Sequence, residues 1–166
     1  MELLLTDLSD LLGKELDAYR SLLSLLQKER RIVVECSVEE LIQANKEKEN
    51  LVLKIRILDQ SREAILEGLA DTMGLSRDEL TLSALEQRLK GPLATQLRTL
   101  RSELSAILKS IRDVNEENRV FLQHSVDFVK GSLALIRYLT VSSPKYMASG
   151  VLDGDRFDGR FVSEKA

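Results

Sequence analysis

Tryptophan is absent from this sequence, and aromatic residues (4%), prolines (two) and glycines (eight) are all scarce. Charged residues, in contrast, make up 31% of the 166 positions and hydrophobic residues 43%. This composition is typical of a single domain built from long helices. It disfavours a β-sandwich or a β-barrel.

Cysteine and histidine occur only once each, as Cys36 and His124. One cysteine cannot form an internal disulfide or a metal cluster, so we interpret Cys36 as a small hydrophobic residue at a helix end. His124 has no glutamate three residues before it and no second histidine, which excludes the usual di-iron and zinc helices. Walker, Rossmann, nucleophile-elbow and Cys-x-x-Cys motifs are also missing. We therefore predict no catalytic residue, metal, cofactor or small-molecule substrate, and hence no enzyme.

Strong charge of one sign and long apolar runs are missing as well. The net charge is −3, which leaves no basic face for phosphates, so nucleic acid is not an expected partner. No apolar run approaches the ~18 residues that a membrane span needs. Residues 1–6 do not begin a signal peptide. These absences predict a cytoplasmic protein.

The most regular stretch runs from Pro92 to about residue 140 and predicts one helix of about 49 residues, or ~73 Å. A heptad stripe that is mostly apolar passes along it: Leu93, Leu97, Leu100, Leu104, Ile107, Ile111, Val114, Asn118, Phe121, Ser125, Phe128, Ser132, Leu135 and Leu139. Such a stripe indicates a helix that packs against other helices. Leu108, Leu122, Val129 and Ile136 widen it, so that the helix can contact two neighbours.

Two further long helices precede this one. Apolar residues at helical spacing predict the first from Glu2 to Val34, interrupted by Glu15 and Glu29, which we expect to be solvated or paired with the nearby basic run of residues 28–31. Ser37-Val38-Glu39-Glu40 matches a capping box and begins the second helix, which Gly74 ends.

Short elements and a tail complete the fold prediction. Ser76-Arg77-Asp78-Glu79 and Ser83-Ala84-Leu85-Glu86 are further capping-box matches and predict one or two short helices before Gly91-Pro92 starts the long one. After Ser142-Ser143-Pro144 the helical period is lost. We therefore predict an all-α, antiparallel bundle of three long helices over residues 1–141, followed by a flexible C-terminal tail over residues 142–166.

Three short patterns resemble the FlgN-type flagellar export chaperones. The segment Ser37-Val38-Glu39-Glu40-Leu41, followed by Lys48, Leu51, Ile55, Leu58 and Arg62, is similar to the second-helix pattern of that family. Asn115 and Asn118, followed by Leu122, are similar to its Asn-x-x-Asn signature in the last helix. Tyr146 and Gly150 resemble its Tyr-to-Gly tail element.

The resemblance implies a chaperone for type III secretion that acts in bacterial flagellum biogenesis. Such a chaperone binds C-terminal helical segments of hook-associated proteins, which form the hook-filament junction. It prevents their premature assembly and delivers them to the export gate. From the residues alone, the stripe of the long helix predicts a groove for an amphipathic partner helix. A structural coiled-coil protein that only self-associates is the alternative.

Helix lengths locate the expected client site. The first two helices reach only ~50 to 54 Å, so about 13 residues at the end of the ~73 Å helix are expected to be uncovered. Phe128, Val129, Leu133, Leu135, Ile136 and Leu139 form an apolar patch there, which the first helix or the tail would otherwise cover. The patch is expected to bind the client, or to mediate self-association without it. The expected client-binding residues are Asn115, Asn118, Phe121, Leu122, Ser125, Phe128, Val129, Ser132, Ile136 and Leu139.

Two assignments remain open between structure and function. Asn115 and Asn118 either fix the register of the bundle or donate hydrogen bonds to the client. Tyr146, with Gly150, either docks on the export gate or packs on the last helical turn.

Overall fold

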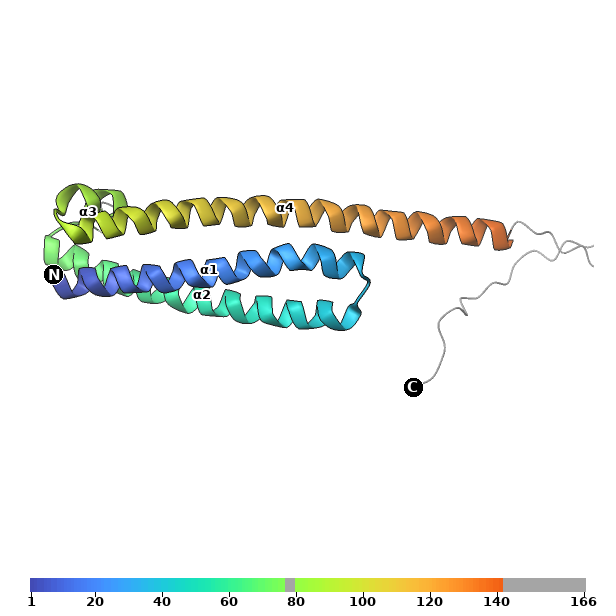
Figure 1. Ribbon diagram of the computed structural model, residues 1–166, viewed down its shortest axis with the longest axis horizontal. Coiled ribbons are helices and arrows are strands. Elements are labelled where there is room, and N and C mark those ends of the chain that lie inside the picture. The colour runs from blue at the N-terminus through green and yellow to red at the C-terminus, as the bar shows by residue number, and fades with distance from the viewer. Residues whose placement is uncertain (77–79, 142–166) are drawn as a thin grey trace, which may run out of the picture. The chain divides into compact units, whose positions relative to one another are not determined.

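The computed structural model describes residues 1–76 and 80–141, and within these ranges it contains helices and no strand. The four helices are α1 (Glu2–Val34), α2 (Val38–Met73), α3 (Leu82–Arg88) and α4 (Pro92–Val141) (Figure 1). The all-α prediction is confirmed, and the three long helices begin and end within a residue or two of the predicted positions. The predicted tail, residues 142–166, lies outside the described residues.

Local sequence explains the junction of α1 and α2 and the end of α2. The Ser37 hydroxyl accepts a hydrogen bond from the Glu40 amide over 3.4 Å, as the capping box predicts. Gly74 has a left-handed φ of 63° and ends α2, since glycine adopts this conformation without a steric cost. Cys36 also has a positive φ, 54°, and is exposed. It stands at a helix end as expected, but its expected role as a packed hydrophobic residue is wrong.

The short helix α3 begins earlier than its capping-box match suggested. Thr81, not Ser83, caps the helix, and its hydroxyl accepts from the Ala84 amide over 3.1 Å. Leu80 and Leu85, which lie on either side of this start, are both buried in the core. The other match extends into residues 77–79, which lie outside the described residues.

The chain divides into two compact units, Met1–Leu122 and Gln123–Ala166, and α4 contributes residues to both. In the first unit α1 and α2 lie side by side as an antiparallel hairpin (Figure 1). Two ion pairs show the direction: Glu15 pairs with Arg62, and the later Glu29 pairs with the earlier Lys48.

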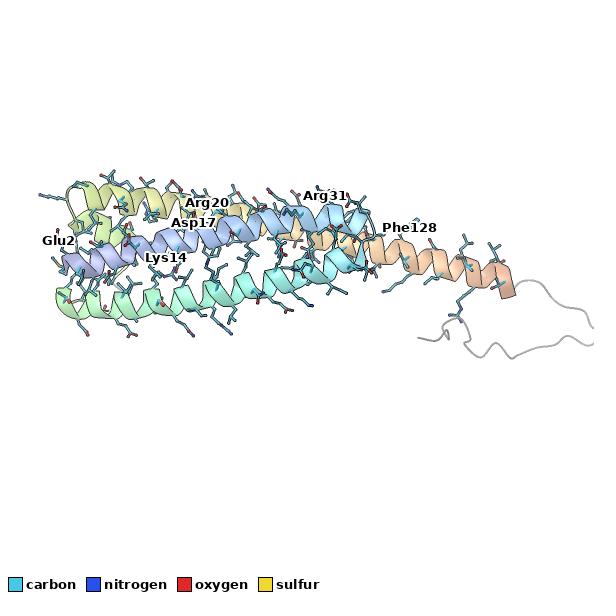
Figure 2. All side chains as sticks on the ribbon, turned by 60° about the horizontal axis from the view of Figure 1, so that its bottom comes forward. Glu2, Lys14, Asp17, Arg20, Arg31 and Phe128 are labelled. Atoms are coloured by element: carbon cyan, nitrogen blue, oxygen red, sulfur yellow. The ribbon has the colours of Figure 1, made fainter. Side chains whose placement is uncertain are left out.

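The part of α4 in the first unit runs parallel to α1. Arg20 of α1, labelled in Figure 2, pairs with Glu103 of α4 over 2.7 Å. Further along both helices, Asn118 of α4 bonds to Leu26 of α1. Rising residue numbers on one helix thus meet rising numbers on the other.

Apolar side chains form two clusters in the first unit. The larger one joins α1, α2, α4 and the segment around α3, and its buried members are Leu5, Leu8, Leu12, Leu16, Leu66, Leu69, Ala70, Leu80, Leu85, Leu97 and Leu104. The smaller one, close to the α1–α2 turn, has only Leu25, Ile32 and Ala44 as buried members. The half of the unit near the turn therefore has less apolar packing, and polar contacts contribute more to its order.

Candidate functional site

The expected client-binding residues do not share one environment. Asn115 is exposed and Asn118 is buried, while Phe121 and Leu122 are half-buried, and all four belong to the first unit. The remaining six expected residues belong to the second unit.

Asn118 is part of a polar cluster that joins three helices. With 5% of its surface exposed, its Nδ2 donates to the Leu26 carbonyl oxygen over 2.7 Å and more weakly to Glu29 Oε2 over 3.4 Å. The other oxygen of Glu29 accepts from Lys48 Nζ over 2.6 Å. We call Glu29, Lys48 and Asn118 the polar brace, because α1, α2 and α4 each contribute one of these side chains.

Glu15 and Glu29 are paired with basic residues, which is one of the two expected outcomes, but solvation and the expected partners are wrong. Both carboxylates are buried, and their partners are Arg62 and Lys48 on α2 rather than the basic run at the end of α1. A carboxylate on the inner face of a helix cannot reach cations on the outer face of the same helix. A buried carboxylate then needs a cation from the facing helix to offset its lost hydration.

Glu15 is the more deeply buried of the two, with 1% of its surface exposed. Burial raises its pKa, although the Arg62 guanidinium, 2.9 Å from Oε2, lowers it and nearby Asp59 raises it further. Its Oε1 has no hydrogen-bond partner among the described residues. Burial, followed by the charge of Glu15, also raises the pKa of Tyr19. These shifts are explained by packing between α1 and α2, so they do not by themselves indicate a catalytic group.

Phe121 also contacts α1. The Arg30 guanidinium carbon lies 5.2 Å from the centre of the Phe121 ring, within the range of a cation–π contact. Phe121 is thus in part a packing residue of the first unit.

The second unit, considered alone, presents apolar residues along the α4 helix. Phe128, labelled in Figure 2, has 75% of its surface exposed, and Leu139 has 61%. We call the α4 apolar face the set Ser125, Val126, Phe128, Val129, Ser132, Leu133, Leu135, Ile136 and Leu139. The two serines are half-buried and the other members are exposed. Val126 is the member that the sequence analysis missed, although it precedes Val129 by three residues and Leu133 by seven.

The Ser132 hydroxyl does not leave a free donor on the α4 apolar face. The Ser132 hydroxyl donates to the Phe128 carbonyl oxygen over 2.9 Å, one turn earlier in the same helix. Its donor is therefore satisfied, and an apolar partner can pack on it without leaving that donor unpaired. Small side chains also allow close approach of another helix.

A helical chain with buried ion pairs between its helices and an exposed apolar helix face has the features of a protein-binding domain. The family model described as FlgN protein matches residues 1–153. The chain belongs to this family, the FlgN-type flagellar export chaperones, which are not known as enzymes. No curated protein and no solved structure gave a significant match. Within residues 1–76 and 80–141, no helix is long and apolar enough to cross a membrane.

Three polar residues of the family resemblance bind to α1, and two of them belong to the polar brace. Lys48, Arg62 and Asn118 are three of the residues on which the family resemblance rested. Each makes a bond to α1 in the structure: Lys48 to Glu29, Arg62 to Glu15, and Asn118 to Leu26. These three polar residues of the resemblance therefore hold α2 and α4 against α1.

Proposed function

We propose that this protein is a cytoplasmic chaperone of type III flagellar export. It binds C-terminal helical segments of hook-associated proteins, which form the hook-filament junction, prevents their premature assembly and delivers them to the export gate. Membership of the family supports the flagellar chaperone role. The α4 apolar face supports the choice of a helical client.

The observation that carries the proposal is the exposure of that face. Seven of its side chains are large and apolar, and each of these is exposed: Val126, Phe128, Val129, Leu133, Leu135, Ile136 and Leu139. A contiguous apolar surface of this kind on a water-facing helix marks an interaction site. An amphipathic helix is a suitable occupant, because its own apolar face is also unstable in water and requires a groove or a partner face.

The expected site residues can be divided by their surroundings. Ser125, Phe128, Val129, Ser132, Ile136 and Leu139 contact the client in this proposal, and exposed Asn115 is available to donate to it. Phe121 and Leu122 are half-buried, so only part of each side chain is available. For Asn118, burial and the bond to Leu26 favour the register role. Tyr146 and Gly150, outside the described residues, are proposed to dock on the export gate.

A double substitution tests the client site. Phe128→Asp with Ile136→Asp places two charges on the face, and it should abolish binding of a purified hook-filament junction protein, measured by titration calorimetry. Circular dichroism should remain helical, because both residues are exposed. The matched control is Val52→Asp with Leu53→Asp on α2, where both residues are similarly exposed. Unchanged client binding in the Phe128 and Ile136 variant would contradict the proposal.

Self-association through the same face is the alternative function. The same exposed residues favour it, since a second copy could cover them. Molar mass measured by light scattering separates the two functions. A monomer that binds the junction protein supports the chaperone, whereas a tight, salt-insensitive oligomer supports a scaffold.

A further inference from the structure

The α4 apolar face is wider than one partner helix covers. Successive residues of a helix are about 100° apart, so its nine residues occupy an arc of about 180° around α4. The stripe that faces a single partner in a two-helix coiled coil is considerably narrower. The width alone thus indicates more than one neighbouring helix.

The arrangement of large and small residues within the arc supports this. Ser125 and Ser132 lie near its middle, with Phe128 on one side and Val129 on the other. One helix laid over the serines covers both of these neighbours. It leaves Val126 and Leu133 at the edge of the arc, where 47% and 55% of their surfaces are exposed. A second helix is needed to cover that edge.

The edge is also charged. Lys130 and Arg137, seven residues apart, lie directly beyond Val126 and Leu133 around the helix. Neither cation has an ion-pair partner in the described part of the chain. Asp127, the one acidic residue of the segment 123–141, lies on the other side and accepts from Gln123 Nε2 over 3.1 Å. A helix packed along this edge can therefore gain two ion pairs if it carries carboxylates at the same spacing.

The charges also distinguish between possible occupants. A second copy of this segment brings two cations and one carboxylate, so it cannot neutralise Lys130 and Arg137 and adds like charge beside them. A different chain with an acidic edge does not have this disadvantage. The charge pattern thus favours a heterologous partner.

We propose that the α4 apolar face binds two helices of one partner chain at once, and that the helix beside Val126 and Leu133 carries acidic side chains facing Lys130 and Arg137. This inference rests on the proposed function, which supplies the partner. It adds two properties of the partner to the proposed function. The partner presents two helices, and the helix beside Val126 and Leu133 is acidic.

Two edge substitutions in the full chain test the number of helices. Val126→Ser with Leu133→Ser should weaken binding of the hook-filament junction protein at least about tenfold, because the second helix loses most of its apolar contact. The control pair, Gln123→Ser with Ala134→Ser, lies on the opposite side of the same helix and should leave the affinity unchanged. Unchanged affinity in the edge variant would show that one helix is sufficient, and would overturn the two-helix inference alone.

Charge reversal tests the chemistry of the second helix. Lys130→Glu with Arg137→Glu should weaken binding several-fold and reduce its dependence on salt. Lys109→Glu with Arg112→Glu makes the same change in net charge at exposed positions of the first unit and should have no effect. Tighter binding after the reversal at 130 and 137 would show a basic partner edge and overturn the inference. Absence of binding by the unaltered chain would instead overturn the proposed function, and this inference with it.

Discussion

Asn118 of α4 donates its side-chain amide to the carbonyl oxygen of Leu26 on α1 over 2.7 Å. A backbone carbonyl has two lone pairs, so Leu26 accepts this bond in addition to its bond within α1. The amide therefore ties two parallel helices together at one point of a mostly apolar stripe. A buried polar residue at such a position fixes the register of helices, because sliding would leave it without a partner.

Asn118→Ala is expected to lower the free energy of unfolding by about 1–3 kcal/mol, because Glu29 loses a donor and the amide leaves a gap. Denaturation in urea, followed by circular dichroism, measures the change. Asn115→Ala is the matched control, since Asn115 is exposed three residues earlier, and it should leave stability unchanged. Equal stability of the Asn118 variant and the unaltered protein would show that the bond to Leu26 contributes nothing.

The helices could be predicted from the sequence because their signals are local. Heptad spacing defined α4, the serine at position 37 defined the start of α2, and Gly74 defined its end. Each of these features depends on residues within a few turns of one another. The start of α3 was not predicted correctly: Thr81 caps the helix two residues before the local match, between the buried residues Leu80 and Leu85.

The partners of the buried charges could not be predicted in the same way. The spacing of Glu15 and Glu29 showed that they interrupt an apolar face, but the cations that meet them lie 47 and 19 residues away. Which cation meets which carboxylate depends on how α1 and α2 align. On α4, the same heptad stripe contains buried Asn118 and exposed Phe128, although the sequence placed both among the expected client-binding residues.

Lys48→Met is expected to destabilise the protein by about 1–3 kcal/mol, because Glu29 then keeps a buried charge without its cation. Adding Glu29→Leu should recover much of this loss, since the charge that needs a partner is gone and the new side chains are apolar. Urea denaturation of the two single variants and the double variant gives the coupling energy of the pair.

The control for this cycle is an exposed ion pair on α4, Glu116 with Arg119. Glu116→Gln should produce no measurable change, because a solvated pair gains little over its separate hydration. If the Lys48 variant were equally neutral, the bond at 2.6 Å to Glu29 would be as weak as the exposed one, and the polar brace would not stabilise the unit.

Glu15→Gln is expected to gain stability relative to the unaltered protein as the pH rises from about 4 through the folded-state pKa of Glu15. Burial raises the pKa of Glu15 in the folded state above its ordinary value of 4.5. Between the unfolded-state pKa and the higher folded-state pKa, the folded state binds more protons than the unfolded state. The contribution of Glu15 to stability therefore decreases as the pH rises through this range, and it is constant above the folded-state pKa. Glutamine does not titrate and therefore lacks this decrease. Urea denaturation of both proteins at a series of pH values measures the difference.

The direction of that difference decides which interaction dominates at Glu15. If attraction to Arg62 were stronger than the loss of hydration, the folded-state pKa would be lowered and the glutamine variant would lose stability relative to the unaltered protein as the pH rises. Glu67→Gln, which removes one negative charge from an exposed position of α2, controls for the change in net charge. A gain for the Glu15 variant that exceeds the Glu67 control would show that the carboxylate is held between α1 and α2 at a cost that its ion pair does not fully offset.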